Sequence, residues 1–308
     1  MKLNGILALT LLITTAACSP SNEGLLDSQD RQNIIGGTIV KKDARLAKST
    51  VGIYDASTTQ ICTGVLLENN IVVTAGHCVS SDTSNLFVVF STDMESLLDD
   101  YALLKKSPLT RRVSGGVVHT EFKLPYENQD PATSSNDIAL IKFNGTTPKG
   151  YMPAKVLTDS SKIEIGQKAL IAGYGAETDN LVEVDIKQTD DIENLIEEGA
   201  VICETDDETK ERRCYYEELD GPAILKSTTV EVKEIPNTFE VILKQDKEHG
   251  ACSGDSGGPA FLKIGTEYYV WGITSRGELG CATQSTFTNI VSYATWIKQN
   301  SALLLKRK

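Results

Sequence analysis

The chain has 308 residues, of which 40% are apolar and 23% charged, a balance typical of a globular protein and not of a disordered one. Its formal net charge is −12, which argues against a surface that follows nucleic-acid phosphates, so no nucleic-acid partner is expected. Residues 176–221 hold 17 acidic and 4 basic side chains. One segment is therefore strongly acidic on an otherwise nearly neutral chain.

Residues 1–17 read as a secretory signal peptide, with Lys2 followed by a short apolar run and small residues before Cys18. This run is short for a membrane span. The sequence Thr15-Ala16-Ala17-Cys18 resembles a bacterial lipoprotein box, although that family usually has leucine where Thr15 stands. We expect an exported precursor with lipid on Cys18, at the outer membrane or cell surface. Ordinary cleavage, with a secreted or periplasmic product, is the alternative, and a buried N-terminal helix is a weaker one. No other segment is long and apolar enough to span a bilayer, so membrane contact is expected only through the lipid.

Export would place the domain where disulfides persist. Seven cysteines are present, and lipidation would account for the odd one, Cys18. The number of cysteines does not choose a pairing among the remaining six. Zinc is a weak alternative because no two cysteines lie two to four residues apart, and no metal or other cofactor is expected. The six are Cys62, Cys78, Cys203, Cys214, Cys252 and Cys281.

Residues 18–33 are polar and read as a linker, and from Ile34 onward short apolar runs alternate with Gly, Asn, Asp and Ser. The runs are β-branched and aromatic and of strand length, which predicts an all-β barrel or sandwich. Only residues 291–305 have helical spacing, and residues 188–200 could form a short helix. The predicted strands are 61–67, 70–76, 85–90, 137–143, 168–175, 227–232, 239–244, 268–274 and 285–290.

Ser256 lies in CSGDSGGPA, where glycines allow a sharp turn and let backbone N–H groups converge on one point. A hydroxyl needs a base to act as a nucleophile. Of the three histidines, His77 in VVTAGHC follows an apolar strand and is tethered by its cysteine neighbour. His119 reads as the end of a strand, and His249 as solvated, with substrate contact as its alternative. Asp137 opens a strongly apolar strand, where a buried carboxylate needs a partner.

Together these motifs, in the order His77, Asp137 and Ser256, resemble the chymotrypsin/trypsin family of serine endopeptidases. The resemblance covers about residues 34–175 and 225–300. It implies two antiparallel β-barrels with a C-terminal helix, and a protease domain over residues 34–308 that carries an acidic insertion at about 176–223.

The same resemblance implies the roles of single residues. His77 is the general base and acid, Asp137 orients it, and Ser256 forms the acyl-enzyme, while the N–H groups of Gly254 and Ser256 form the oxyanion hole. It also implies the disulfides Cys62–Cys78 and Cys252–Cys281. That leaves Cys203 and Cys214 to pair inside the acidic insertion, a bridge that the common family pattern lacks.

Residues 34–37 read IIGG and resemble the new N-terminus of a cut zymogen. The ammonium of Ile34 would then pair with Asp255 and order the oxyanion loop. The preceding residue is Asn33 and not a base, and Arg31 lies two positions further back, so a different activating protease, trimming, or another start of the mature chain are all open. An ordinary strand start at Ile34 is the simpler alternative.

The specificity pocket is placed by alignment with the family. Gly250 falls at its base, where trypsin-type members have aspartate, so a preference for Lys or Arg is not expected. Gly277 and Ser285 fall on the walls, and Ser275 beside the substrate backbone. Apolar or small neutral side chains are therefore expected, with attraction of acidic ones by Arg276 and His249 as the alternative. On this alignment, Gly250→Asp would shift the preference towards basic residues.

The sequence thus predicts a monomeric serine endopeptidase that is activated by another protease and acts on proteins or peptides. A catalytically inactive binding protein on the same fold is the first alternative. An esterase is the second, although its usual GxSxG motif lies on an α/β sheet, and the alternating strand–helix pattern is missing here. The insertion reads as a solvated flap, with substrate selection, calcium binding or exclusion of partners as other possibilities.

Overall fold

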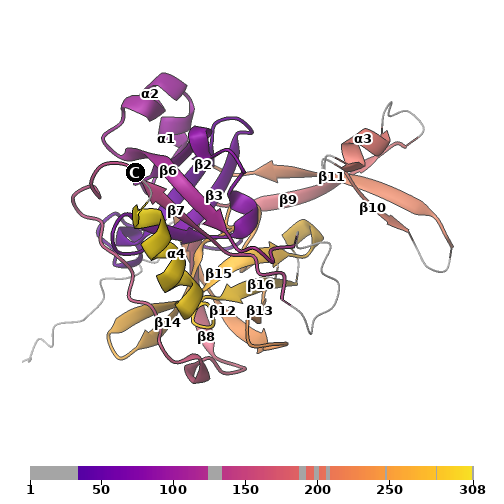
Figure 1. Ribbon diagram of the computed structural model, residues 1–308. Helices are drawn as coiled ribbons and strands as arrows, with labels where there is room; N and C mark the ends of the chain where they lie inside the picture. Colours follow the sequence, from indigo (N-terminus) through magenta and orange to yellow (C-terminus); the bar gives the residue numbers. More distant parts are fainter. Residues whose placement is uncertain are drawn as a thin grey trace, which may run out of the picture.

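The computed structural model describes residues 34–123, 134–186, 192–197, 201–205, 209–246, 248–281 and 283–306. The expected signal peptide, Cys18 and the linker lie outside these residues. Two antiparallel β-barrels form the body, so the predicted all-β fold class is confirmed (Figure 1). No helix in the described part of the chain has the length and apolar character needed to cross a membrane.

The first barrel is closed, with the strand order β2-β3-β4-β7-β6-β5. Its interior is filled by β-branched and aromatic side chains, among them Phe90 and Phe143, whose ring centroids lie 5.3 Å apart. Its strands are β2 (Thr50–Asp55), β3 (Gln60–Leu66), β4 (Ile71–Thr74), β5 (Leu86–Val89), β6 (Thr110–Val118) and β7 (Ala139–Phe143).

The second barrel has the strand order β12-β13-β16-β15-β14-β8 and closes by pairing of β12 with β8. The short strand β1 (Thr38–Ile39) adds to β12. A single core cluster contains residues of both barrels, including Leu140 and Ile273, so the two barrels are packed against each other. The strands are β8 (Lys168–Gly173), β12 (Lys226–Glu234), β13 (Glu240–Lys244), β14 (Pro259–Ile264), β15 (Glu267–Gly277) and β16 (Gln284–Asn289).

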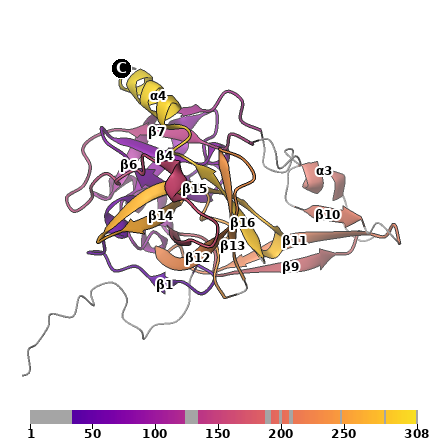
Figure 2. The same cartoon turned by 90° about the horizontal axis from the view of Figure 1, so that it is seen from below.

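The acidic insertion forms a separate three-stranded sheet of order β10-β11-β9, which projects from the barrels (Figures 1 and 2). Its strands are β9 (Thr178–Val184), β10 (Ile202–Thr205) and β11 (Arg212–Asp220), and it carries the short helix α3 (Ile192–Glu197). A helix within residues 188–200 is thus present.

Three further helices lie against the barrels. The C-terminal helix α4 (Ala294–Lys306) covers β6 and β7 of the first barrel (Figure 1), where Lys142 Nζ donates to the carbonyl oxygen of Leu304 at 3.3 Å. The other two, α1 (Glu95–Leu98) and α2 (Tyr101–Lys106), follow β5. Every apolar run predicted as a strand overlaps a strand of the structure, because these runs fill the two barrel cores.

Candidate active site

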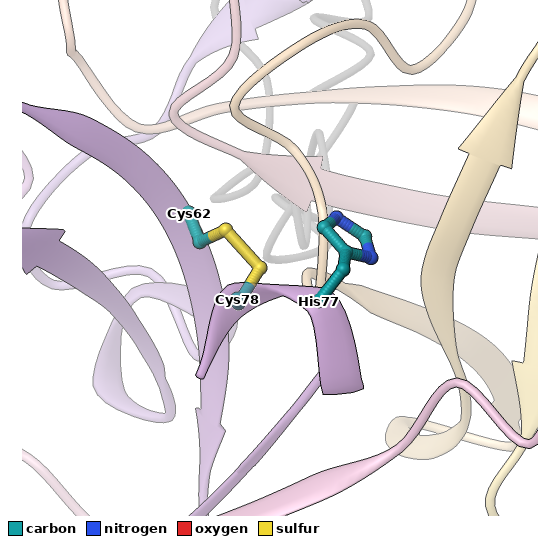
Figure 3. A group of neighbouring side chains, drawn as sticks. All are labelled: Cys62, His77 and Cys78. Atoms are coloured by element: carbon teal, nitrogen blue, oxygen red, sulfur yellow. A yellow bond between two sulfur atoms is a disulfide. The ribbon is translucent and has the colours of Figure 1, made fainter. Parts of the chain in front are cut away.

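His77 is held by a tight turn at the end of β4. Residues Gly76–Cys78 form a 3-10 turn, and the disulfide Cys62–Cys78 fastens this turn to β3 (Figure 3). The backbone N–H of His77 donates to Asp137 Oδ1 at 3.1 Å, and its Nδ1 lies 2.9 Å from Asp137 Oδ2. Both the backbone and the ring of His77 are therefore oriented by the same carboxylate, 60 residues away in the sequence.

Asp137 lies two residues before the start of β7 and is completely buried. A buried carboxylate is costly without partners, and three donors meet it: the backbone and ring of His77, and Ser275 Oγ at 2.7 Å. Burial alone raises the pKa of Asp137, but the charge of His77 and these hydrogen bonds hold the pKa below its ordinary value. Burial lowers the pKa of His77, while the Asp137 charge and hydrogen bond raise it by more, so this imidazole is a stronger base than in water.

Ser256 lies in a loop whose glycines have no room for side chains. A Cβ on Gly257 (φ +79°) would lie 2.0 Å from Thr74 Oγ1, and one on Gly254 (φ +99°) 2.8 Å from the Cα of Gly175. The positive φ values also disfavour other residues. The loop is anchored to the first barrel because the Thr63 N–H donates to the Ser256 carbonyl at 2.8 Å.

The backbone N–H groups of this loop divide into bonded and free ones. The N–H of Asp255 donates to the Cys252 carbonyl and that of Gly257 to the Thr274 carbonyl. Those of Gly254 and Ser256 donate to no described residue. Two free donors beside a serine are what an oxyanion hole requires.

His77 and Ser256 line one cavity of about 460 Å³, together with Gly254, Cys62 and Tyr174. Ser256 also lines an adjoining cavity of about 320 Å³, which we call the specificity pocket. The three side chains expected at the reaction centre therefore come together from both barrels: His77 and Asp137 from the first, Ser256 from the second. The site offers a base, an orienting carboxylate, a hydroxyl and two free N–H donors.

A model of the family described as Trypsin matches residues 34–297. The chain belongs to the trypsin family. Among its relatives, kallikrein 1-related peptidase b27 of Mus musculus is 26% identical, over 88% of this chain and 91% of that protein. Chymotrypsin-like elastase family member 1 of Macaca fascicularis is 25% identical, over 87% and 90%. Granzyme F of Mus musculus is 24% identical, over 89% and 93%.

The specificity pocket of this trypsin-family domain is lined by three of the four residues that the alignment placed there, Ser275, Gly277 and Ser285. Gly250 is buried and is not among the lining residues, because the Gln245 side chain stands against it. Ser275 has a second role that the sequence did not indicate, since its hydroxyl supports Asp137.

The two side chains considered for attracting acidic substrates are differently placed. Arg276 forms a two-point pair with the buried Glu240, at 3.0 and 2.9 Å, and also donates to Ser135 Oγ at 3.2 Å. Its charge is thus already matched within the protein. The Nδ1 atom of His249 lies 3.4 Å from Asp246 Oδ1, and His249 is not among the pocket-lining residues. Neither arrangement supports recognition of an acidic side chain.

The residues expected to become the new N-terminus, Ile34 and Ile35, are buried in the protein. Ile34 is completely buried, the Ile35 carbonyl accepts from the Gly250 N–H at 3.1 Å, and Ile35 packs on the Cys252–Cys281 disulfide. Asp255 Oδ1 and Oδ2 accept from the N–H groups of Gly175 at 2.8 Å and Cys252 at 2.9 Å. Burial raises the pKa of Asp255 to about 6, so this carboxyl lacks full compensation for its charge. No bond between Ile34 and Asp255 is found in the described part of the uncut chain.

Three disulfides occur among the described residues, Cys62–Cys78, Cys203–Cys214 and Cys252–Cys281, the pairs that the family resemblance implied. The second joins β10 to β11 within the insertion. Two clusters of potential metal ligands occur among the described residues, one around His77 and one around Asp179. Each depends on two cysteines of a disulfide, which have no free thiolate to offer a metal.

Two residues of the insertion lie at the specificity pocket, which agrees with substrate selection, one of the alternatives to a solvated flap. Ile202 of β10 and Glu217 of β11 line the specificity pocket. Burial raises the pKa of Glu217 to about 7, and the neighbouring carboxyl of Asp179 adds to that rise. No sequence signal could have shown these contacts, because they depend on how β10 and β11 lie relative to the Cys252–Cys281 disulfide, which lines the same pocket.

His119 has a structural environment and not a catalytic one. Its ring lies 5.5 Å from that of Tyr293 and 5.4 Å from that of Trp296, on the side of α4. It lines a separate cavity that does not contain Ser256. This placement agrees with its interpretation as the end of a strand.

Proposed function

We propose that this chain is an active serine endopeptidase that hydrolyses peptide bonds through an acyl-enzyme. The observation that carries the proposal is the His77–Asp137 pair beside Ser256 in one cavity, with two unpaired N–H groups next to the serine. His77 takes the proton of Ser256 Oγ as this oxygen attacks the substrate carbonyl. The N–H groups of Gly254 and Ser256 then receive the developing oxyanion, and losing one such donor typically costs about 3–4 kcal/mol in the transition state.

The second half of the reaction uses the same groups. His77, now protonated, gives its proton to the leaving amine, and Asp137 stabilises the imidazolium in the meantime. A water activated by His77 then attacks the acyl-enzyme and releases Ser256. Asp137 can stabilise the imidazolium because its carboxylate stays ionised: its hydrogen bonds and the charge of His77 keep its pKa low.

A fluorophosphonate probe tests the proposal directly, because it labels only a serine activated as a nucleophile. The processed protein should be labelled at Ser256, and a peptide-library assay should find internal cleavage. Absence of both in folded protein would favour the alternative, an inactive binding protein on this fold. Cleavage of esters without cleavage of any peptide would favour an esterase.

We further propose that the protein is bacterial, made as an exported zymogen with lipid on Cys18, and released when another protease generates the N-terminus at Ile34. The burial of Ile34 and the incompletely compensated Asp255 support the cut at Ile34, since a new ammonium would pair with that carboxylate. The segment 19–33 contains no cysteine, so cutting would separate the domain from its anchor. N-terminal sequencing of soluble and membrane fractions tests this, and cut enzyme that stays in the membrane after a salt wash would contradict it.

The proposed preference is for substrates other than Lys or Arg, with protein or peptide substrates cleaved by a monomer that needs no cofactor. The support comes from the alignment, in which the position of the pocket base holds Gly250 and therefore no carboxylate. The matched charge of Arg276 argues equally against an acidic preference.

A further inference from the structure

A buried glutamine covers the residue expected at the base of the specificity pocket. A Cβ atom on Gly250 would lie 2.7 Å from both Cδ and Oε1 of Gln245. The space that a longer residue at position 250 would need is therefore filled. This is why Gly250 does not line the pocket of about 320 Å³, while its neighbour Ala251 does.

The carboxamide of Gln245 is almost fully buried, and its hydrogen bonds join two walls of the pocket. Its Oε1 accepts from the Ala251 N–H at 3.1 Å, and its Nε2 donates to the carbonyl oxygens of Ala251 at 3.3 Å and Cys281 at 2.8 Å. Both partners line the pocket. With one N–H and two carbonyls as partners, only an amide in this orientation satisfies all three groups.

The pocket also contains an unused hydrogen-bonding group. Ser285 lines it, is 1% exposed, and its Oγ has no partner among the described residues. A buried hydroxyl without a partner is unfavourable, and a ligand that supplies one removes that cost. Of the charged lining residues, Arg276 is paired with Glu240, Glu217 is half-buried and Glu278 is exposed.

We propose that Gln245 is a specificity-determining residue that closes the base of the pocket and fixes its walls. The pocket then selects an uncharged substrate side chain of moderate length whose end hydrogen-bonds to the Ser285 hydroxyl, such as asparagine or threonine. We call the substrate residue that enters this pocket the acyl-side residue, because its carbonyl forms the acyl-enzyme. The inference rests on the proposed peptidase function and specifies its substrate class.

The first experiment compares peptides whose acyl-side residue differs only in polarity: asparagine against leucine, and threonine against valine. Wild type should favour the polar member of each pair about tenfold in kcat/KM. Ser285→Ala should bring both ratios close to one, because cleavage of the asparagine and threonine peptides loses the hydrogen bond to the hydroxyl. A wild type that prefers the apolar members, or ratios unchanged in Ser285→Ala, would overturn the proposal.

The second experiment tests the closed base. Gly250→Asp alone should gain no cleavage after lysine, because Gln245 occupies the space. Gly250→Asp combined with Gln245→Gly should gain at least tenfold over the single variant, since glycine also removes the Gln245 Cβ, which would lie 2.8 Å from a Cβ at position 250. Gln299→Ala, at an exposed glutamine of α4, is the matched control. It should change neither cleavage after lysine nor the asparagine-to-leucine ratio. Gain of lysine cleavage by Gly250→Asp alone, or none by a folded, labelled double variant, would contradict the role of Gln245.

Each preparation is first titrated with the fluorophosphonate probe, so kcat/KM is expressed per active serine. Wild type that folds but does not label would refute the peptidase function itself and not its specificity. If the double variant does not fold, the asparagine-to-leucine ratio in Gln245→Ala decides, since loss of the wall contacts should reduce that ratio at least threefold. An unchanged ratio would count against the proposal.

Discussion

Removing the hydroxyl of Ser275 should weaken catalysis although this residue belongs to no expected triad. Its Oγ donates to Asp137 Oδ2 at 2.7 Å, and both residues are buried, 2% and 0% exposed. A hydrogen bond to a charged group is worth about 1.5–3 kcal/mol, and a factor of ten in rate corresponds to about 1.4 kcal/mol. Because part of the bond already exists before the reaction, we expect Ser275→Ala to lower kcat/KM about tenfold.

The pH dependence should change in a defined direction. Without Ser275, the Asp137 carboxylate has one donor fewer and interacts more strongly with the imidazolium, so the pKa of His77 should rise further above its ordinary value. The acidic limb of the kcat/KM profile should therefore move to higher pH in Ser275→Ala. A merely structural role of the hydroxyl would leave this limb unmoved.

Thr288→Val is the matched control. Its Oγ1 also donates to Asp137, but to the backbone carbonyl oxygen, at 3.0 Å, and it is equally buried. We expect a loss of about 1 kcal/mol in the free energy of unfolding and a change in kcat/KM below about threefold. The measurements are peptide cleavage per labelled serine and urea unfolding. If both variants lost activity equally, or if Ser275→Ala lost none, the assigned function of the Ser275–Asp137 bond would be wrong.

Three other outcomes are expected. Ser256→Ala should abolish peptide cleavage and leave the thermal midpoint within a few degrees of wild type, and turnover equal to wild type would refute its role as nucleophile. The pKa of Glu217 is raised to about 7 and that of Asp255 to about 6, so these two groups bind more protons in the folded than in the unfolded chain between about pH 4 and pH 7. Their contribution to the free energy of unfolding should fall as pH rises through that window, so Glu217→Gln should change the slope of stability against pH in the positive direction; an equal slope in this variant would contradict the assignment. Replacing Cys203 and Cys214 with serine should speed proteolysis within the projecting insertion and change the thermal midpoint of the barrels little, since that disulfide joins only β10 and β11; a large fall would show that the insertion supports the barrels.

The sequence by itself was enough to predict features that depend on contiguous residues. The GDSGGP segment specifies a serine among glycines, and the apolar runs specify strands, because turn geometry and strand burial depend on neighbours in the chain. The strands β12 and β13 were placed to within a few residues for this reason. That His77 and Asp137 meet was implied by family resemblance and not by local physics, since 60 residues separate them.

Only the tertiary structure decided which groups have partners. The sequence allowed Arg276 to attract acidic substrates, but Glu240, on another strand, matches its charge. The Gln245 side chain stands against Gly250, the residue that the alignment placed at the base of the pocket. Ile202 and Glu217 line that pocket from an insertion that the sequence predicted to be a flap. Hydrogen bonds and cavity walls are made between segments distant in the chain, so their energies depend on packing that no local pattern records.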